Sequence, residues 1–255
     1  QAGEIVGQAL ALLAAVREPS AADQQLPAAE DSLKLDELGL NLVFMGMGEP
    51  LLNYDQVLKA ARIMHDPAGL NISWRRITVS TAGVVPGIRR LQEERLPLNL
   101  AVSLHAAENR LRDRLVPINR KYPLEQLIPA CRDYAAASGR RLTFEYVLLP
   151  GVNDRPEQAH RLGRLLEGML ALVNLIPENP ADPPGEPAPG AGPRRAQPPG
   201  RAGAAARFVR ILRQYGIGAT VRQGRGGEIA AACGQLRSRC HRTGERERDG
   251  GLGKD

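Results

Sequence analysis

Strand-like and helix-like segments alternate along most of this 255-residue chain, and no other feature restricts its fold as much. Short runs rich in Val, Ile and Leu are followed by longer segments with apolar residues at helical spacing. The predicted strands are 42–45, 76–80, 99–105, 142–149, 172–176 and 219–222. The predicted helices are 2–16, 54–65, 87–95, 123–138, 155–169 and 205–215. Such alternation indicates a parallel sheet with right-handed crossover helices.

The number and order of the predicted strands favour one architecture. Six strands are too few for a complete eight-unit barrel, and strand and helix alternate too regularly for an α+β fold. We therefore expect an α/β fold built as an open sheet or a partial barrel. A chain of this length with 43% hydrophobic residues can bury the core that such a fold needs.

Cysteine usage and hydropathy point to a reducing compartment. Cys131, Cys233 and Cys240 are too few and too scattered to form a disulfide framework. The sequence has no apolar run of about 18 residues, so no membrane span is expected, and no leader peptide is visible at its start. The simplest interpretation is a cytoplasmic protein.

Positive charge is concentrated toward the carboxyl end of the chain. Residues 194–255 contain 14 Arg and Lys against 5 Asp and Glu, whereas residues 1–193 contain 20 against 23. This imbalance suggests contact with a polyanion such as RNA or DNA, although a solvated, disordered tail is the favoured interpretation of residues 237–255. We expect the core to span 1–236, interrupted at 181–204 by a flexible insertion rich in Pro, Gly, Ala and Arg.

Four short segments that contain polar residues follow predicted strands at the point where each strand ends. Because the carboxyl ends of parallel strands meet at one rim, we expect these segments to face one pocket for a polar small molecule. The segments are Gly48–Glu49, Ser80–Thr81, Ser103–Leu104–His105 and Asn179. Taken singly, each has a simpler explanation, such as an ordinary turn at the glycines or a hydrogen-bonded structural histidine. Glu145 lies within its strand and is explained equally well as an interior carboxylate with a partner.

One strand-to-helix connection resembles that of a known family. Residues 45–53, with the sequence Met-Gly-Met-Gly-Glu-Pro-Leu-Leu-Asn, closely resemble the adenosylmethionine-binding turn of certain radical SAM methyltransferases. These enzymes methylate an adenine C2 in large-subunit ribosomal RNA and form the RlmN/Cfr family. Further matching motifs occur in the family's order at 79–86, 103–106, 114–122, 144–147, 152–154, 174–177 and 231–236. The likeness extends over residues 1–180 and 205–236.

This resemblance implies a partial (β/α)6 TIM-like barrel that holds a 4Fe–4S cluster and S-adenosyl-L-methionine. By the motif match, Gly48 and Glu49 bind the amino-acid end of the cofactor. Further contacts to the cofactor are implied for Ser80, Ser103, Leu104, His105 and Asn179. The implied partners are ribosomal RNA, with tRNA as a further substrate, and an external electron donor. The protein is expected to be a monomer.

The resemblance also implies a reaction. One S-adenosyl-L-methionine methylates Cys233, and a second yields a 5′-deoxyadenosyl radical that takes a hydrogen atom from the S-methyl group. The resulting methylene radical adds to adenine C2. Nearby Arg222 and Arg225 favour the thiolate form, which accepts the methyl group. Without the matching flanks Cys233 is better explained as an unreactive buried thiol; Cys131 is predicted to be a core residue, and Cys240 has no assigned role.

The chain departs from the family in its cysteines. The C-x3-C-x2-C motif, which supplies the three thiolate ligands of the cluster, is absent from the sequence. We therefore expect that the chain is N-terminally truncated, without the cluster loop, the first strand, the resolving cysteine and an N-terminal RNA-binding region, and that it is inactive as a fragment. Glu178 also stands where the family usually has an aromatic residue.

Two alternatives to adenine-C2 methylation stay open. The first is the branch of the same family that methylates adenine C8 and confers antibiotic resistance. The second is a catalytically dead RNA-binding product, in which the motifs are retained without the reaction. The identity of the methylated base separates the first alternative, and cleavage of S-adenosyl-L-methionine separates the second.

Overall fold

The computed structural model describes residues 1–17, 40–45, 48–177 and 199–222. Its strands form one sheet in the order β1-β2-β3-β4-β5-β6, and each neighbouring pair is parallel. The strands are β1 (Leu42–Phe44), β2 (Ile77–Thr81), β3 (Asn99–Ser103), β4 (Leu142–Leu148), β5 (Ala171–Pro177) and β6 (Gly218–Val221). The predicted strands and their parallel arrangement are therefore confirmed.

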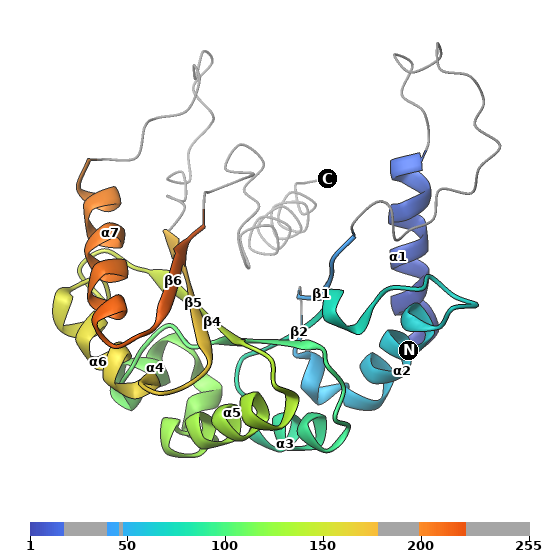
Figure 1. Ribbon diagram of the computed structural model, residues 1–255, viewed down its shortest axis with the longest axis horizontal. Helices are drawn as coiled ribbons and strands as arrows, with labels where there is room; N and C mark the ends of the chain where they lie inside the picture. Colours follow the sequence, from blue (N-terminus) through green and yellow to red (C-terminus); the bar gives the residue numbers. More distant parts are fainter. Residues whose placement is uncertain (18–39, 46–47, 178–198, 223–255) are drawn as a thin grey trace, which may run out of the picture.

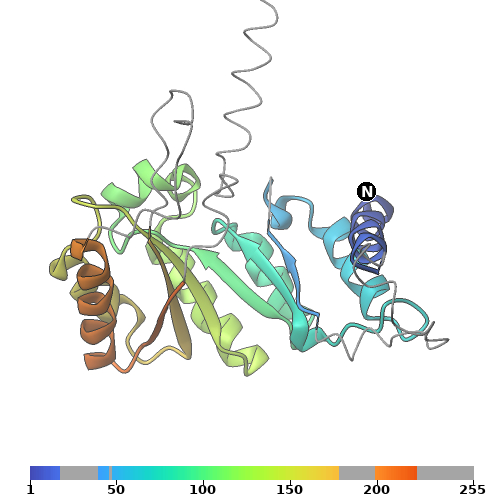
Figure 2. The same ribbon diagram turned by 90° about the horizontal axis from the view of Figure 1, so that it is seen from above.

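Helices cover one side of this sheet. Figure 1 shows the sheet as an arc with the helices along its outer side, and Figure 2 shows the same layers from above. The α-helices are α1 (Ala2–Arg17), α2 (Tyr54–His65), α3 (Val85–Glu93), α4 (Asn109–Leu115), α5 (Leu124–Ser138), α6 (Pro156–Leu166) and α7 (Pro199–Gln214). Short 3-10 helices are η1 (Pro50–Leu52), η2 (Trp74–Arg76) and η3 (Pro117–Arg120). This is the predicted α/β fold, a partial (β/α)6 TIM-like barrel.

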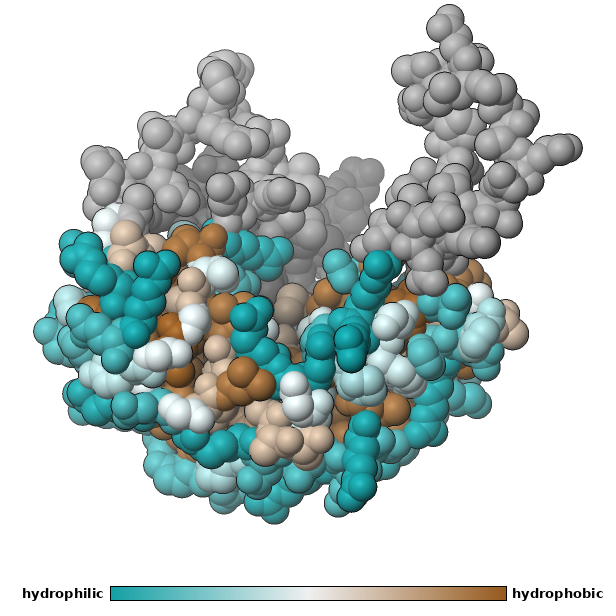
Figure 3. All heavy atoms as spheres, in the orientation of Figure 1, coloured by the Kyte–Doolittle hydropathy of each residue, from teal (hydrophilic) through white to brown (hydrophobic). Residues whose placement is uncertain are grey.

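Side chains alternate between the two faces of each strand, so one face packs on the helices and the other lines the inside of the arc. Phe144 and Tyr146 of β4 belong to the main hydrophobic core, and the Tyr146 ring lies 5.3 Å from that of Phe208 in α7. Glu145, between them, therefore lies on the inner face. Figure 3 shows mostly hydrophilic residues over the outer, helical side of the arc and hydrophobic residues grouped nearer its inner side.

The helix α1 has its own small core with α2. Ala60 and Met64 of α2 are fully buried there together with Ile77 of β2, and Ile5 and Val6 of α1 pack against them. The helix predicted for residues 2–16 is thus confirmed. Among the described residues, no helix is long and apolar enough to span a membrane.

The predicted strand 99–105 ends at Ser103, and two helices also differ from the predictions. Helix α4 was not predicted, because a seven-residue helix with three arginines carries no recognisable apolar stripe. Helix α7 begins at Pro199, whereas 205 was the predicted start and residues up to 204 were expected to be flexible. Proline is favoured in the first turn of a helix, which accounts for the earlier start. The rest of the predicted insertion and the predicted tail lie outside the described residues.

Gly87 brings α3 against η1, the short helix that follows Glu49. A Cβ atom on residue 87 would lie 2.7 Å from the Cβ of Leu51, which is itself buried. We expect Gly87→Ala to lower the free energy of unfolding by about 1–3 kcal/mol, because α3 and η1 must separate to admit the methyl group. Urea denaturation followed by circular dichroism measures this change.

Gly7→Ala is the matched control. Gly7 also lies inside a helix, but no heavy atom stands within 4 Å of an added Cβ. Alanine there should raise the stability by up to about 1 kcal/mol through helix propensity. Equal destabilisation by both substitutions would contradict the close packing of α3 on η1.

Candidate functional site

The segment after β1 is tied to the end of β2 by a carboxylate. Gly48 has a φ of +103°, a conformation in which other residues are strained, which explains the glycine before Glu49. Glu49 Oε1 accepts a hydrogen bond from the Leu51 N–H at 3.1 Å and so caps η1. Glu49 Oε2 accepts one from the Ala82 N–H at 2.7 Å. Gly48 and Glu49 therefore lie at the rim, as predicted.

The end of β2 carries two buried hydroxyl groups. Ser80 is 8% exposed and lies on the inner face, opposite Val79, which packs in the core. Thr81 Oγ1 accepts hydrogen bonds from the N–H groups of Gly83 and Val84, at 3.0 and 3.2 Å. Thr81 thus fixes the turn into α3, while Ser80 presents its hydroxyl beside the same rim.

The Ser103–Leu104–His105 segment leaves β3 along the edge of β4. Ser103 pairs in register with Glu145, and the Leu104 N–H donates to the Glu145 main-chain oxygen at 3.0 Å. Leu104 is fully buried, and its side chain packs in the core. Only its main chain lies at the rim. His105 adopts a φ of +57°, in the left-handed region that non-glycine residues rarely occupy.

His105 is a neutral imidazole with a defined tautomer. Its Nδ1 accepts a hydrogen bond from the Val147 N–H at 3.1 Å, so the ring proton belongs on Nε2. Burial, with a smaller contribution from the Arg112 cation, lowers the pKa of His105 to about 4. The ring therefore offers one N–H donor at neutral pH. The alternative that the sequence left open, a hydrogen-bonded structural histidine, also holds in part, because the His105 ring fixes its own loop.

Asn153 connects the turn after β4 with the main chain of His105. It is fully buried, and its Nδ2 donates to the carbonyl oxygens of His105 at 2.8 Å and Val147 at 2.7 Å. Its Oδ1 accepts from the Leu149 N–H at 2.7 Å. Residues 152–154 matched the family motif, but nothing in the sequence assigned this task to the asparagine.

A row of polar side chains crosses the inner face of β4, β5 and β6. Asn174 Nδ2 donates to Glu145 Oε2 at 2.9 Å, and Thr220 Oγ1 donates to Asn174 Oδ1 at 3.3 Å. The three residues are in register on adjacent strands. Burial raises the pKa of Glu145, while the Asn174 hydrogen bond and the Arg222 charge oppose that rise. Glu145 is thus an interior carboxylate with a partner, one of the explanations the sequence left open.

A buried arginine that the sequence did not single out lies behind the rim. Arg112 of α4 is 0% exposed, and its guanidinium donates to the carbonyl oxygens of Ala82, Ser103 and Leu104. One arginine among many in the sequence gives no signal of burial. Its position just before the 114–122 motif is the only hint that the sequence offers.

The rim fits a small polar ligand better than it fits an iron–sulfur cluster. Carboxylate, hydroxyl, imidazole and main-chain groups converge there, and these bind amino, carboxylate and hydroxyl groups. Of the three cysteines, only Cys131 is among the described residues; it is fully buried in α5, and burial raises its pKa to about 12. No group of three His, Cys, Asp or Glu in the described part could hold a metal ion. These residues do not fit a cluster.

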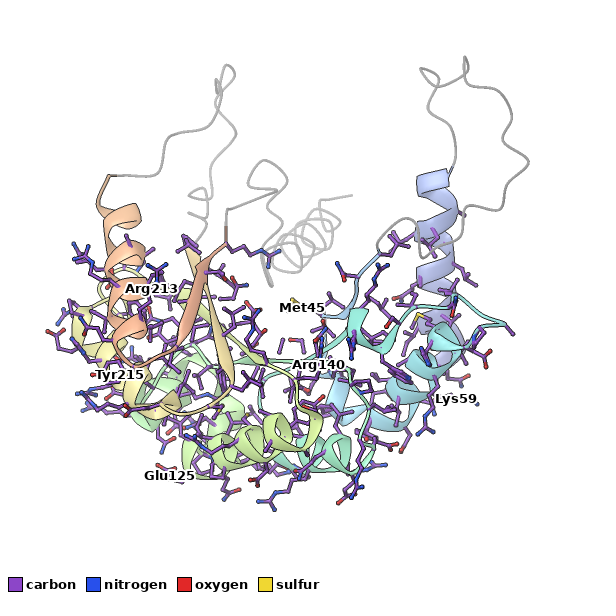
Figure 4. The ribbon with its side chains drawn as sticks, in the orientation of Figure 1. Met45, Lys59, Glu125, Arg140, Arg213 and Tyr215 are labelled. Carbon is purple, nitrogen blue, oxygen red and sulfur yellow. The ribbon has the colours of Figure 1, made fainter. Side chains whose placement is uncertain are left out.

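Two predicted site residues, Asn179 and Cys233, lie outside the described residues. The remaining predicted residues lie at or just after the carboxyl ends of β1, β2 and β3. Glu49 is joined to the loop after β2 by the Ala82 N–H, and Arg112 joins that loop to the carbonyl oxygens of Ser103 and Leu104. Figure 4 shows Met45, just after β1, on the inner side of the arc. In the same view Lys59, Glu125 and Tyr215 lie on its outer, helical side.

An open parallel α/β sheet with its polar groups at one carboxyl edge is typical of cofactor-binding enzymes. The family model of the Radical SAM superfamily matches residues 22–163. The chain belongs to this superfamily. A crystal structure of a radical SAM methyltransferase from Sphaerobacter thermophilus superposes with a TM-score of 0.73 at 46% sequence identity, covering 92% of this chain and 61% of that one.

Relatives of known name are similar over most of the chain. A Moorella thermoacetica protein, "Probable dual-specificity RNA methyltransferase RlmN", is 53% identical over 236 residues, which is 92% of this chain and 60% of that protein. A protein of the same name from Symbiobacterium thermophilum is 54% identical over 202 residues, which is 79% of this chain and 52% of that protein. The chain thus spans little more than half the length of these relatives.

His105 should make the folding free energy depend on pH. Its pKa is about 4 in the folded protein, whereas an ordinary histidine titrates near 6.5. Unfolding therefore takes up a proton between these values. The stabilising contribution of His105 is complete above pH 6.5 and is lost as the pH falls toward 4, by on the order of 3 kcal/mol.

Urea denaturation at about pH 7.5 and about pH 5 measures this dependence. His105→Asn should flatten it, because asparagine tolerates the left-handed backbone but does not titrate. His160→Asn is the matched control, since His160 pairs with Tyr215 in the helical layer. An unchanged pH dependence in His105→Asn would show that another group causes it.

Proposed function

We propose that this chain is the cofactor-binding core of an RNA methyltransferase that methylates adenine C2 in ribosomal RNA and also in tRNA. The observation that carries the proposal is the identity of 53% over 92% of the chain to a protein named as an RNA methyltransferase. The convergence of Glu49, Ser80 and Ser103–Leu104–His105 on one rim supports it, because these are the positions that the family motif assigns to S-adenosyl-L-methionine.

In this proposal S-adenosyl-L-methionine, when bound, supplies the methyl group. Gly48 and Glu49 would hold its amino-acid end, where the open space beside Gly48 allows close approach to the main chain. The main chain of Ser103–Leu104–His105 would face the nucleoside, and the Nε2–H of His105 would offer a donor. The hydroxyl of Ser80 would offer the ligand a further hydrogen-bonding group.

The remaining roles rest on the sequence resemblance. Cys233 is proposed as the methyl-carrying cysteine and Asn179 as a further cofactor contact. The domain limits, 1–236 for the core with an insertion at 181–204, also remain proposals. So do a monomeric state, a cytoplasmic location and the need for an external electron donor.

Exposed basic residues beside the rim support a polyanionic partner. Arg110 and Arg114 lie on α4, Arg120 ends η3, and Lys121 follows it; all four are exposed. Within the described residues, none of the four side chains forms an ion pair or a hydrogen bond. Lys121 lies over the Tyr122 ring at 5.4 Å. We call these four residues the basic rim, and phosphate groups are the ligands it suits.

Replacing the four residues of the basic rim by glutamine should weaken RNA binding at low salt by about tenfold or more. The slope of log affinity against log salt should fall by about 0.7–0.9 for each lost phosphate contact. Fluorescence anisotropy with a labelled ribosomal RNA fragment, measured over a range of salt concentrations, gives both quantities.

The control variant replaces Lys59, Arg89, Arg141 and Arg164 by glutamine. These residues are also exposed and lie away from the rim: on α2, on α3, just before β4 and on α6, in that order. The change in net charge is the same. The control should retain most of the affinity. If the two variants lose affinity equally, the basic rim is not the contact surface.

The base specificity is tested on a protein that contains this core and has the full length of its relatives, prepared without oxygen and with a 4Fe–4S cluster reconstituted. Ribosomal RNA and tRNA are incubated with S-adenosyl-L-methionine and a reductant, and the nucleosides are separated by liquid chromatography and mass spectrometry. We expect 2-methyladenosine. Appearance of 8-methyladenosine would instead support the C8 branch, and no methylated adenosine in either RNA would contradict the proposed function.

Cys233→Ser should abolish the product in this assay, because serine cannot be methylated to a group that yields the required methylene. Cys240→Ser is the matched control and should retain activity. A Cys233→Ser variant with full activity would remove the proposed role of this residue.

The chain as it stands should not cleave S-adenosyl-L-methionine. Its three cysteines lack the spacing that binds a 4Fe–4S cluster, and the one that is described is buried in the core. After treatment with iron, sulfide and dithionite, we expect no 5′-deoxyadenosine by liquid chromatography. Formation of 5′-deoxyadenosine would contradict the expectation that this chain alone is inactive.

A further inference from the structure

We propose that Arg112 is a positioning residue, which holds the main chain after β2 and the main chain after β3 in the relative placement that the S-adenosyl-L-methionine site needs. The inference rests on the proposed function, because it assigns a task within the same site. Arg112 itself is fully buried and would not touch the ligand.

The hydrogen bonds of the guanidinium reach two separate loops. Arg112 Nη2 donates to the Ala82 oxygen at 2.7 Å and to the Ser103 oxygen at 3.0 Å. Arg112 Nε donates to the Leu104 oxygen at 3.2 Å. One planar group thus sets the distance between the turn that follows β2 and the segment that leaves β3.

Ala82 extends this connection to the segment after β1. Its carbonyl oxygen accepts from Arg112, and its N–H donates to Glu49 Oε2 at 2.7 Å. A displacement of Ala82 would therefore also displace the Glu49 carboxylate. All three segments with described candidate site residues are linked through Arg112 and this one residue.

The guanidinium is itself held from behind. Arg112 Nη1 donates to Asn119 Oδ1 at 2.8 Å, and Asn119 Nδ2 donates to Asp113 Oδ1 at 2.6 Å and to Asn109 Oδ1 at 3.1 Å. Asn119 is buried as well. Asn119 and the side chains of α4 that hold it thereby fix the orientation of the guanidinium plane.

The local sequence makes room for this arrangement. Gly83 has a φ of +114°, and a Cβ atom there would lie 3.1 Å from Arg112 Nη2 and 3.2 Å from a Leu127 methyl carbon. Only arginine offers enough directed N–H groups in one plane to serve four acceptors, since a lysine ammonium is a point charge with three donors. Burial lowers the pKa of Arg112 to about 10, so the group stays charged at neutral pH.

A purely stabilising role for Arg112 makes a different prediction from a positioning role. Loss of a general stabilising contact would speed hydrogen exchange throughout the core, whereas loss of a positioning contact would act first on the rim amides. Tyr134→Phe is the matched control. It removes another buried donor to a carbonyl, the 3.1 Å bond from the Tyr134 hydroxyl to the Leu98 oxygen, which lies ahead of β3 and away from the rim.

The experiment compares wild type, Arg112→Gln, Arg112→Lys and Tyr134→Phe by amide hydrogen exchange and by calorimetric titration with S-adenosyl-L-methionine. In Arg112→Gln we expect the Ala82 amide to exchange about tenfold faster relative to the Phe144 amide, and the Kd for S-adenosyl-L-methionine to rise about tenfold. For Arg112→Lys, both the relative exchange rate of the Ala82 amide and the Kd should lie between the values of Arg112→Gln and wild type. Tyr134→Phe should change neither the Ala82-to-Phe144 exchange ratio nor the Kd by more than about twofold.

A second readout is the ring of His105, one of four histidines, followed by NMR. Loss of the Arg112 cation should raise its pKa, since that cation lowers it in the wild type. If the Ala82 and Phe144 amides accelerate equally, or if the affinity for S-adenosyl-L-methionine is unchanged, the positioning role is overturned. If wild type binds no S-adenosyl-L-methionine, the proposed function is contradicted, and the Ala82 exchange without ligand still decides what Arg112 holds.

Discussion

Parallel pairing of the strands places the ends of β1, β2 and β3 at one edge of the sheet, and the described candidate site depends on this constraint. The register follows from burial. Val102, Phe144 and Val173 are fully buried between sheet and helices, so a shift of one residue would turn them toward the inside of the arc. The same register carries Ser103, Glu145 and Asn174 across the inner face. Burial of the hydrophobic residues therefore determines the register, and the register determines where these polar side chains lie.

The rim is fixed mainly by hydrogen bonds between side chains and main chain. The Glu49 carboxylate accepts from Ala82, the Arg112 guanidinium donates to three carbonyl groups, and Asn153 joins the loops after β3 and β4. Main-chain partners hold these charged side chains without a second ion, and hydrogen bonds to a charged group are stronger than those between neutral groups. His105 illustrates the consequence, because its Nδ1 is occupied by the Val147 N–H and its ring stays neutral.

Much of this arrangement could be predicted from the sequence, because the strands are runs of β-branched and aliphatic residues and Gly48 needs a positive φ. The contacts that hold the rim could not. Arg112 is one arginine among many, and its burial follows from the unpredicted helix α4 and from the space that Gly83 leaves. The single hydrogen bond from the Ala82 N–H to the Glu49 carboxylate joins residues 33 positions apart, which no local pattern encodes. Local periodicity specifies the elements, whereas the loops between them depend on tertiary contacts.

Crystals of the chain soaked with S-adenosyl-L-methionine would reveal whether the carboxyl edge of the sheet is the ligand site. We expect the amino-acid end of the ligand beside Gly48 and Glu49, its nucleoside against Ser103–Leu104–His105, and the Glu49–Ala82 hydrogen bond intact. Ligand bound at the opposite edge or among the helices, or a Glu49 carboxylate that has left Ala82, would contradict it.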